Sequence, residues 1–298
     1  MNLYHLRVFQ TVAEHEHITR ASEELILSQP AVTKIIQSLE HETGLELIER
    51  HGRRIVLTHA GHVLHSYARR MFALEREMED ALAVLQDVEA GEIKLAANTT
   101  TGVYLLPPIV ARYRTLYPQV TLHIDILNSH EIIEQTLNWT LDFGLVEGDS
   151  STLPPGLHVD VFAQDELVLV VAPGHRWSRL DELSLESLRE GELLLREQGS
   201  GIREVIEHAL LLHRVQVRPL FTLPDNEAIK QMVMSGVGAA IVSALAVQRE
   251  LTSEDLIRIQ ITGVDLRPQL SLVRRTDKQL SRAAQAFCAL LQPDIEIG

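Results

Sequence analysis

Residues Ser28–Leu39 read Ser-Gln-Pro-Ala-Val-Thr-Lys-Ile-Ile-Gln-Ser-Leu, and this stretch decides the N-terminal fold. Ser28 is a good helix cap, and Pro30 follows in the first turn, where proline costs no hydrogen bond. An apolar stripe at i, i+3, i+4 and i+7 begins at Val32. We therefore predict a helix that ends at Gly44.

The opposite face of this predicted helix is polar and carries no negative charge before Glu40. Such a face suits the DNA major groove, where the N-terminal end of a recognition helix reads base edges. Taken alone, it is also the ordinary solvated face of an amphipathic helix. The candidate DNA-contacting residues here are Ser28, Gln29, Pro30, Ala31, Thr33, Lys34 and Gln37.

The flanking segments complete a winged helix-turn-helix. Two helices are predicted before this one, the first ending near Glu16 and the second spanning 18–26. After it, the apolar runs 45–50 and 54–57 flank His51-Gly52-Arg53, a pattern typical of a β-hairpin. We expect a wing whose arginines lie along the sugar-phosphate backbone or in the minor groove. The candidate DNA-contacting arginines are Arg20, Arg50, Arg53 and Arg54.

Residues 62–90 contain neither glycine nor proline and follow Thr58, a good helix cap. Their apolar residues repeat every seven positions, which indicates a helix that pairs with another helix. Because a second copy of the chain is the most economical partner, we predict a homodimer. A long helix packed on its own domain is the alternative. The predicted dimerisation residues are Leu64, Tyr67, Met71, Leu74, Met78 and Leu85.

From Gly91 onward, predicted strands and helices alternate, which is typical of an α/β domain with parallel strands. The predicted strands are 93–97, 120–126, 142–146, 167–171, 193–195, 215–221, 238–242 and 270–273, and the predicted helices are 102–116, 132–141, 202–213, 226–235 and 281–291. We expect a DNA-binding domain over 1–58, a linker helix over 59–90 and an effector domain over 91–298. Its lobe I would hold about 91–163 and 269–298, and its lobe II about 164–268.

Three loops follow predicted strands and precede predicted helices, at 98–102, 198–201 and 224–227. At such places the helix offers free N–H groups and the positive end of its dipole to a ligand. Their hydroxyls and amides, with one arginine at Arg203, would suit a carboxylate or a phosphate. Helix capping alone is the alternative explanation for each loop.

Composition excludes several classes of protein. The net charge is −14, and residues 1–61 hold six Lys or Arg against eight Asp or Glu, so charge alone gives no sign of nucleic acid. No apolar stretch approaches the roughly 20 residues of a membrane span, and no secretory signal opens the chain, so we expect a cytoplasmic protein that does not contact membranes. The single Cys288 excludes an intramolecular disulfide.

Neither a metal site nor an active site is indicated. His59, His62 and His65 are spaced by three, but no cysteine or acidic ligand completes the set, so we expect no metal and no other cofactor. Gly199-Ser200-Gly201 lacks the spacing of a nucleophile elbow, and no phosphate loop is present. We therefore predict that the chain is not an enzyme. A small-molecule-binding module without a transcriptional role remains the alternative.

Several motifs together resemble known proteins. The N-terminal motifs resemble the signature of LysR-type transcriptional regulators; they are Thr19-Arg20-Ala21, Leu25, Ser28-Gln29-Pro30-Ala31-Val32-Thr33-Lys34, Leu39-Glu40, Gly44 and Leu57-Thr58-His59-Ala60-Gly61. Later motifs are similar to the effector domain of the branch that governs carbon fixation and cysteine or sulfur metabolism; they are Leu105-Leu106-Pro107-Pro108, Tyr117-Pro118, 142–147, 196–203 and 226–230. Ile202 stands where this branch usually has threonine.

The resemblance implies double-stranded DNA and RNA polymerase as partners, and assembly as dimers or tetramers. It also implies a small, often anionic, metabolite held between two lobes like those of periplasmic binding proteins. Together with the three loops, it gives the candidate effector-binding residues Asn98, Thr99, Thr100, Thr101, Asn128, Glu147, Gln198, Ser200, Gly201, Arg203 and Asn226.

Overall fold

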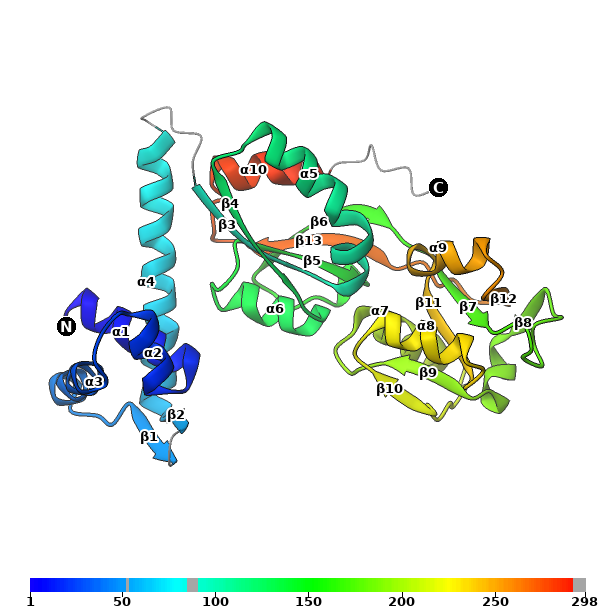
Figure 1. Ribbon diagram of the computed structural model, residues 1–298, viewed down its shortest axis with the longest axis horizontal. Helices are drawn as coiled ribbons and strands as arrows, with labels where there is room; N and C mark the ends of the chain where they lie inside the picture. Colours follow the sequence, from blue (N-terminus) through cyan, green and yellow to red (C-terminus); the bar gives the residue numbers. More distant parts are fainter. Residues whose placement is uncertain (52–53, 85–90, 292–298) are drawn as a thin grey trace. The chain divides into compact units, whose positions relative to one another are not determined.

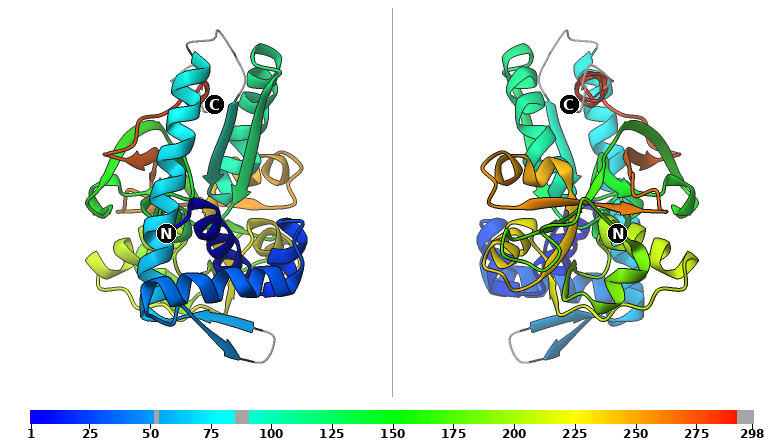
Figure 2. Two further views of the ribbon diagram at one scale, coloured as in Figure 1. Left: turned by 90° about the vertical axis from the view of Figure 1, so that its left-hand side faces the viewer. Right: turned by 90° about the vertical axis from the view of Figure 1, so that its right-hand side faces the viewer.

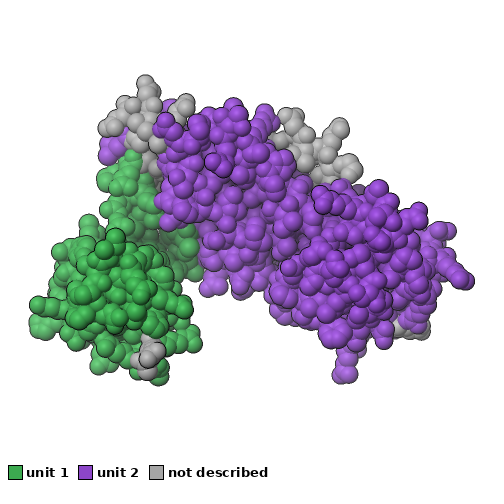
Figure 3. Space-filling view, viewed as in Figure 1, with its two compact units in different colours: residues 1–79, 138–140 green, residues 80–137, 141–298 purple. Residues whose placement is uncertain are grey.

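The computed structural model describes residues 1–51, 54–84 and 91–291. They divide into two compact units, one formed by 1–79 with 138–140 and the other by 80–137 with 141–298 (Figure 3). Within the described ranges, no helix is both long and apolar enough to cross a membrane.

The first unit begins with three helices, α1 (Leu3–His15), α2 (Ile18–Glu24) and α3 (Gln29–Thr43). Their apolar faces form one core, in which Phe9 and Leu39 are fully buried. Small Ala21 is also fully buried there. Because α3 gives its apolar stripe to this core, its polar face is left exposed, as the spacing predicts.

A two-stranded hairpin and a long helix complete this unit (Figure 2). Strands β1 (Ile48–His51) and β2 (Arg54–Leu57) pair antiparallel, and α4 runs from His59 to Val84. The Thr58 hydroxyl caps α4 by accepting a hydrogen bond from the N–H of Gly61 at 3.0 Å. A Cβ at Gly61 would lie 2.1 Å from the carbonyl oxygen of Leu47, so glycine lets α4 pass close to the chain entering the hairpin. The last predicted residues of this helix, 85–90, lie outside the described residues.

The second unit contains two lobes, each built on a mixed sheet (Figure 1). Lobe I has the strand order β4-β3-β5-β13-β6, with α5 and α10 covering one face and α6 the other. Its elements are β3 (Gly91–Ala97), a π-helical turn (Thr101–Leu105), α5 (Leu106–Leu116), β4 (Val120–Ile126), α6 (Ser129–Leu137), β5 (Phe143–Gly148), β6 (Leu157–Gln164), β13 (Gln269–Arg275) and α10 (Arg282–Ala289).

Lobe II has the strand order β10-β9-β11-β7-β12-β8. Helix α7 packs on one face of its sheet, and α8 with α9 on the other. Its elements are β7 (Leu167–Val171), β8 (Glu182–Ser184), a 3₁₀ segment (Leu185–Glu190), β9 (Leu193–Arg196), α7 (Gly201–Leu212), β10 (Phe221–Leu223), α8 (Asn226–Met234), β11 (Ala239–Ser243), α9 (Ala244–Thr252) and β12 (Ile257–Thr262). The chain passes between the lobes twice, after β6 and after β12.

The predicted two-lobed α/β architecture is confirmed, but the expectation of parallel strands is wrong for part of each sheet. β13 pairs antiparallel with β5 and β6, and β7 pairs antiparallel with β11 and β12. Both antiparallel strands, β7 and β13, directly follow a passage between the lobes, and neither is preceded by the crossover helix that joins parallel neighbours.

The strand predicted over 215–221 is also wrong, since the only part of it that pairs is Phe221, the first residue of β10. Val215 is buried in the core of lobe II, so its apolar character reflects packing of a loop and not a sheet. Pro219, which has no N–H, cannot take part fully in a ladder. The helix predicted over 132–141 lies earlier, at Ser129–Leu137.

Candidate functional sites

The exposed face of α3 borders a hollow of about 700 Å³ in the first unit. Three elements supply its lining: the start of α2, the outer face of α3 and the hairpin. The lining residues are His17, Ile18, Thr19, Gln29, Pro30, Thr33, Lys34, Gln37, Arg50 and Ile55. Six of the predicted DNA-contacting residues are therefore gathered at one concave surface, between a helix and a wing.

The start of α3 is built as the sequence predicts. The Ser28 hydroxyl caps the helix by accepting a hydrogen bond from the N–H of Ala31 at 3.3 Å. Thr33 is half-buried, and Lys34 and Gln37 are exposed. A major groove would thus meet hydrogen-bonding side chains from the N-terminal half of α3.

The predicted arginines have different surroundings. Arg20 is exposed, and Arg50 lines the hollow. The guanidinium of Arg54 donates two hydrogen bonds to one oxygen of Glu16, from Nε at 2.9 Å and from Nη2 at 2.6 Å. Arg54 is therefore bound to α1's C-terminal end, which the sequence pattern does not reveal. Arg53 lies outside the described residues.

Helix α4 has two apolar faces with different roles. One face, with Ala68 and Phe72, is buried in the core of the first unit. Leu64 also packs on this core and is not on the exposed seam. The other face leaves large apolar side chains exposed to solvent: Tyr67, Met71, Leu74, Met78 and Leu82. The predicted seam residue Leu85 lies outside the described residues.

No cluster of three possible metal ligands occurs among the described residues, which include the histidines at the start of α4. His65 is buried, with its ring edge-on to Phe9. Arg69 donates a hydrogen bond from Nε to its Nε2 at 3.2 Å. Burial, aided by the positive charge of Arg69, lowers the pKa of His65 to about 4.

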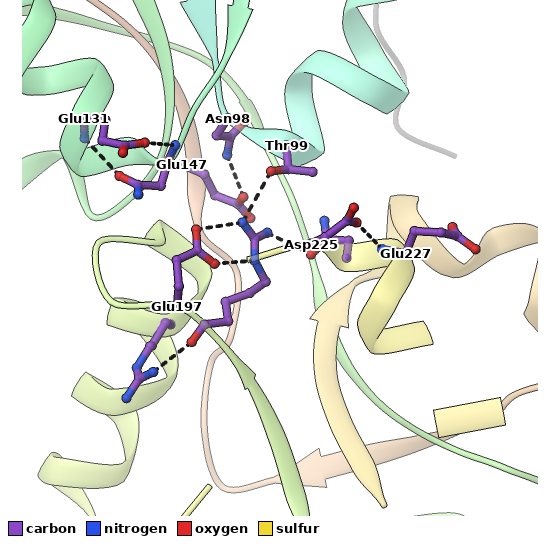
Figure 4. Close-up of polar contacts among 11 residues, drawn as sticks. Asn98, Thr99, Glu131, Glu147, Glu197, Asp225 and Glu227 are labelled. Atoms are coloured by element: carbon purple, nitrogen blue, oxygen red, sulfur yellow. Dashed lines mark hydrogen bonds and ion pairs between the residues drawn. The ribbon is translucent and has the colours of Figure 1, made fainter. Parts of the chain in front are cut away.

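In the second unit, a cleft of about 700 Å³ lies between the two lobes. Lobe I contributes the loop after β3, the end of β4 and the start of α6, whereas lobe II contributes the end of β9 and the start of α8. The lining residues are Thr99, Val103, Tyr104, Ile126, Leu127, Asn128, Glu131, Arg196, Glu197, Pro224, Asp225, Asn226 and Glu227. Figure 4 shows Thr99 of lobe I facing Glu197 and Asp225 of lobe II.

Arg196 is the centre of the polar contacts in this cleft. Its Nη1 donates to the side-chain oxygen of Asn226 at 2.8 Å, and its Nη2 donates to the hydroxyl of Thr99 at 3.3 Å. Its Nε and Nη2 also donate to the two carboxylate oxygens of Glu197, at 2.9 and 3.1 Å. Because Thr99 belongs to the other lobe, the Arg196 side chain joins the two lobes.

Polar side chains are buried directly behind the cleft in lobe I. Asn98 donates from its side-chain nitrogen to Glu147 at 2.7 Å and accepts the N–H of Thr101 at 2.9 Å. The hydroxyl oxygens of Thr100 and Thr101 are buried without a hydrogen-bond partner. Burial and the neighbouring Asp165 raise the pKa of Glu147 well above its ordinary value.

The other predicted effector residues lie differently. Gln198 is exposed, whereas Ser200 and Gly201 are buried at the start of α7 and do not line the cleft. Arg203 is buried and donates to the Arg196 carbonyl oxygen at 2.8 Å and to Glu207 at 2.7 Å. Arg203 therefore supports the loop that carries Arg196 and does not face the cleft.

At Gly201 the backbones of the two lobes pass close to one another. A Cβ there would lie 1.8 Å from the carbonyl oxygen of Glu147. Beside it, the N–H of His130 in lobe I donates to the carbonyl oxygen of Gly199 in lobe II at 3.1 Å. Ile202, the departure noted in the sequence, is buried in the core of lobe II.

Sequence reasoning missed Arg196, Glu197 and Tyr104. The signal for the first two was available, because they end β9 and precede the loop 198–201, and ligands gather at such strand ends. The predicted strand stopped at residue 195, one residue before Arg196. Tyr104 gave no usable signal, since it lies in a π-helical turn that extends α5.

Family comparisons match both parts of the chain. Residues 3–62 match the family described as bacterial regulatory helix-turn-helix protein, lysR family, and residues 86–295 match the LysR substrate binding domain. The chain is 34% identical over 290 residues to the RuBisCO operon transcriptional regulator of Allochromatium vinosum, which covers 96% of this chain and 94% of that protein.

Two solved structures are also similar to this chain. Full-length CbnR complexed with its target DNA has a TM-score of 0.68 and 25% identity, covering 98% of this chain and 99% of that one. The CcmR regulatory domain of Synechocystis PCC6803 in complex with 2-PG has a TM-score of 0.61 and 25% identity, covering 67% of this chain and 95% of that one. The chain therefore belongs to the LysR family of DNA-binding transcriptional regulators, with an N-terminal helix-turn-helix and an effector-binding domain.

Proposed function

We propose that this regulator reads its operator with the hollow between α3 and the wing, and that a small metabolite with an anionic group binds in the interlobe cleft. We further propose that it acts as a homodimer, or as a tetramer of two such dimers, and that it controls transcription through RNA polymerase. The gathering of Gln29, Thr33, Lys34 and Arg50 at one surface is the observation that carries the first proposal.

The DNA-binding face would use two kinds of contact. Gln29, Thr33 and Gln37 can hydrogen-bond base edges from the N-terminal half of α3. Lys34, Arg20 and Arg50 can neutralise phosphates, which gives most of the affinity but little of the specificity. The net charge of −14 makes this local placement of cations essential, because the chain as a whole repels DNA.

The anionic class of metabolite is supported by the chemistry of the cleft. Arg196 supplies a guanidinium fork, the geometry that matches a carboxylate or phosphate. The N-termini of α6 and α8 border the same cleft, and helix N-termini favour anions. The 2-PG in the complex with the CcmR regulatory domain is a first compound to test.

Dimerisation would cover the exposed apolar seam of α4. Tyr67, Met71, Leu74 and Met78 follow a heptad spacing and lie 44–65% exposed in the single chain. A symmetric pair of such helices would bury them and present two DNA-binding units to two half-sites.

In vitro transcription with purified RNA polymerase tests the proposed control of transcription. Adding the protein is expected to change the transcript yield from templates that carry its operator and not from other templates.

A gel-shift titration with DNA from upstream of the protein's own gene tests operator recognition. Lys34→Ala should weaken specific binding and lower the salt dependence by about one charge. Arg218→Ala, which removes an equally exposed charge from the second unit, is the matched control and should bind as the wild type does. Equal binding by the Lys34→Ala and wild-type proteins would place the reading surface elsewhere.

A further inference from the structure

The interlobe cleft is surprisingly acidic for a site that binds an anion. Among the described residues that line it, Arg196 carries the only positive charge, against Glu131, Glu197, Asp225 and Glu227. An anionic group that enters this cleft therefore depends on Arg196 and must overcome repulsion from the surrounding carboxylates.

The guanidinium of Arg196 is already largely occupied. It has five N–H donors. Two bind the carboxylate of Glu197 side by side, one binds Asn226 and one binds Thr99, so a single donor on Nη1 is left. Glu197 holds the Nε–Nη2 edge, one of the two edges by which a guanidinium binds a carboxylate or phosphate through parallel hydrogen bonds.

The two partners of this ion pair differ in their freedom to move. The Arg196 side chain is only 5% exposed and is held by residues of both lobes, whereas that of Glu197 is 23% exposed at the cleft. The main chain of Glu197 is anchored, because its N–H donates to the carbonyl oxygen of Leu223 at 3.1 Å. Its carboxylate can therefore rotate into solvent while Arg196 and the backbone stay in place.

A second, independent donor in the same cleft has no partner. Asn226 is 1% exposed, and its side-chain nitrogen is buried without a hydrogen bond. The orientation of this amide is settled by Arg196, which can only donate, so the oxygen of Asn226 faces the guanidinium and the nitrogen is the free group. A buried unsatisfied donor is costly, and a ligand acceptor placed beside it removes that cost.

We propose that Glu197 is a built-in competitor of the effector. In the free protein its carboxylate occupies the guanidinium edge of Arg196. The carboxylate or phosphate of the effector replaces it there and also accepts the hydrogen bond of the Asn226 nitrogen. This proposal rests on the proposed anionic effector of the cleft. Because Arg196 also holds Thr99, the exchange takes place at one of the contacts that join the lobes.

The exchange makes Glu197 a determinant of effector affinity and specificity. A single small anion gains less binding free energy from Arg196 than it would if Glu197 were absent, because it must first displace the carboxylate of Glu197. An effector with further polar groups to bind the other residues of the cleft gains enough to complete the exchange.

The test is isothermal titration of the full-length protein with inorganic phosphate and, separately, with 2-PG at fixed ionic strength. Glu197→Gln should bind both anions about tenfold more tightly than the wild type, because a neutral amide competes poorly for guanidinium. Glu227→Gln removes the same charge from the lining, and Glu207→Gln removes it from the partner of Arg203, outside the cleft. Both controls should change anion affinity by less than about threefold.

An equal increase in anion affinity in Glu197→Gln and Glu227→Gln would overturn the proposal. The increase would then come from removing any negative charge from the cleft and not from freeing Arg196. Wild-type affinity in a Glu197→Gln protein that does bind the anion would also overturn it, whereas no anion binding by any of the proteins would overturn both this proposal and the anionic effector on which it rests. Arg196→Gln should lose anion binding and keep operator binding in the gel shift. If the wild-type protein does not bind operator DNA in the gel shift, the proposed DNA-binding function is contradicted instead. Thermal unfolding of each variant identifies any protein that has failed to fold.

Discussion

The carboxyl groups of Glu147 and Asp165 are buried beside one another, one at the end of lobe I's β5 and the other where the chain leaves β6 for lobe II, and one oxygen of each has no hydrogen-bond partner. Burial raises the pKa of both groups, most strongly that of Glu147. A carboxyl pair of this kind is stable when it shares a proton, since two buried negative charges would repel.

This pair predicts that the second unit loses stability as the pH rises. The folded pKa of Glu147 lies above its unfolded value, so the stabilisation is complete below the ordinary carboxyl pKa of about 4 and is lost as the pH passes through the raised value. Glu147→Gln, whose neutral amide does not titrate beside Asp165, should show a flatter dependence of the thermal midpoint on pH. Exposed Glu134→Gln should keep the wild-type slope, and identical slopes for all three proteins would contradict the shared proton.

His65 predicts the opposite dependence in the first unit. Its folded pKa of about 4 lies below the usual 6.5, so its contribution is present above pH 6.5 and is lost as the pH falls toward 4. The difference corresponds to roughly 3 kcal/mol. Hydrogen exchange of α1 and α4 in the full-length protein should accelerate over this range. His65→Gln should lack that step, and an unchanged step in this variant would assign it to another group.

The exposed seam of α4 predicts a variant that remains folded but does not dimerise. Leu74 is 65% exposed in the single chain, so Leu74→Asp should leave the monomer's core intact and introduce like charges between paired helices. Sedimentation should then report monomers. Leu211→Asp, at a position 75% exposed on α7, is the control and should stay dimeric. A dimeric Leu74→Asp protein would exclude this seam as the interface.

The close approach at Gly201 predicts that a single methyl group disturbs the contact between lobes. Gly201→Ala would place its Cβ 1.8 Å from the Glu147 carbonyl oxygen, so the backbone must shift, at a cost of about 1–3 kcal/mol. Gly174→Ala meets no atom within 4 Å and should be nearly neutral. Denaturant unfolding measures both variants. A Gly201→Ala protein as stable as the wild type would show that the lobes separate there without cost.

The regular elements follow from the sequence where one physical signal dominates. The cap at Ser28, the stripe that includes Leu39 and the stop at Gly44 describe α3 correctly, because local propensity and core packing agree there. The antiparallel β13 could not be predicted in the same way. Its pairing with β5 joins segments more than a hundred residues apart, and alternation of apolar residues does not encode strand direction.

More residues of the candidate DNA-binding face than of the interlobe cleft could be predicted from the sequence. The candidate DNA-binding face is formed by neighbouring segments of the chain, the start of α2, the outer face of α3 and the hairpin, so most of its members could be placed by spacing. The cleft depends on which side chains of two lobes meet. Sequence reasoning selected Arg203 for its charge, but tertiary contacts bury it against the Arg196 carbonyl oxygen and leave Arg196 at the cleft. The pairing of Arg54 with Glu16 is a similar long-range contact.

The most direct test of the account is a footprint of the full-length protein on the DNA upstream of its own gene. We predict two protected major-groove segments whose centres are one helical turn, about 10 base pairs, or a whole multiple of it apart, because a symmetric dimer presents two copies of α3. Lys34→Ala should weaken the protection of both segments together, so that more protein is needed for the same footprint, whereas Arg218→Ala should leave it unchanged. Uniform protection without discrete segments, or a footprint unchanged by Lys34→Ala, would contradict operator recognition through this face.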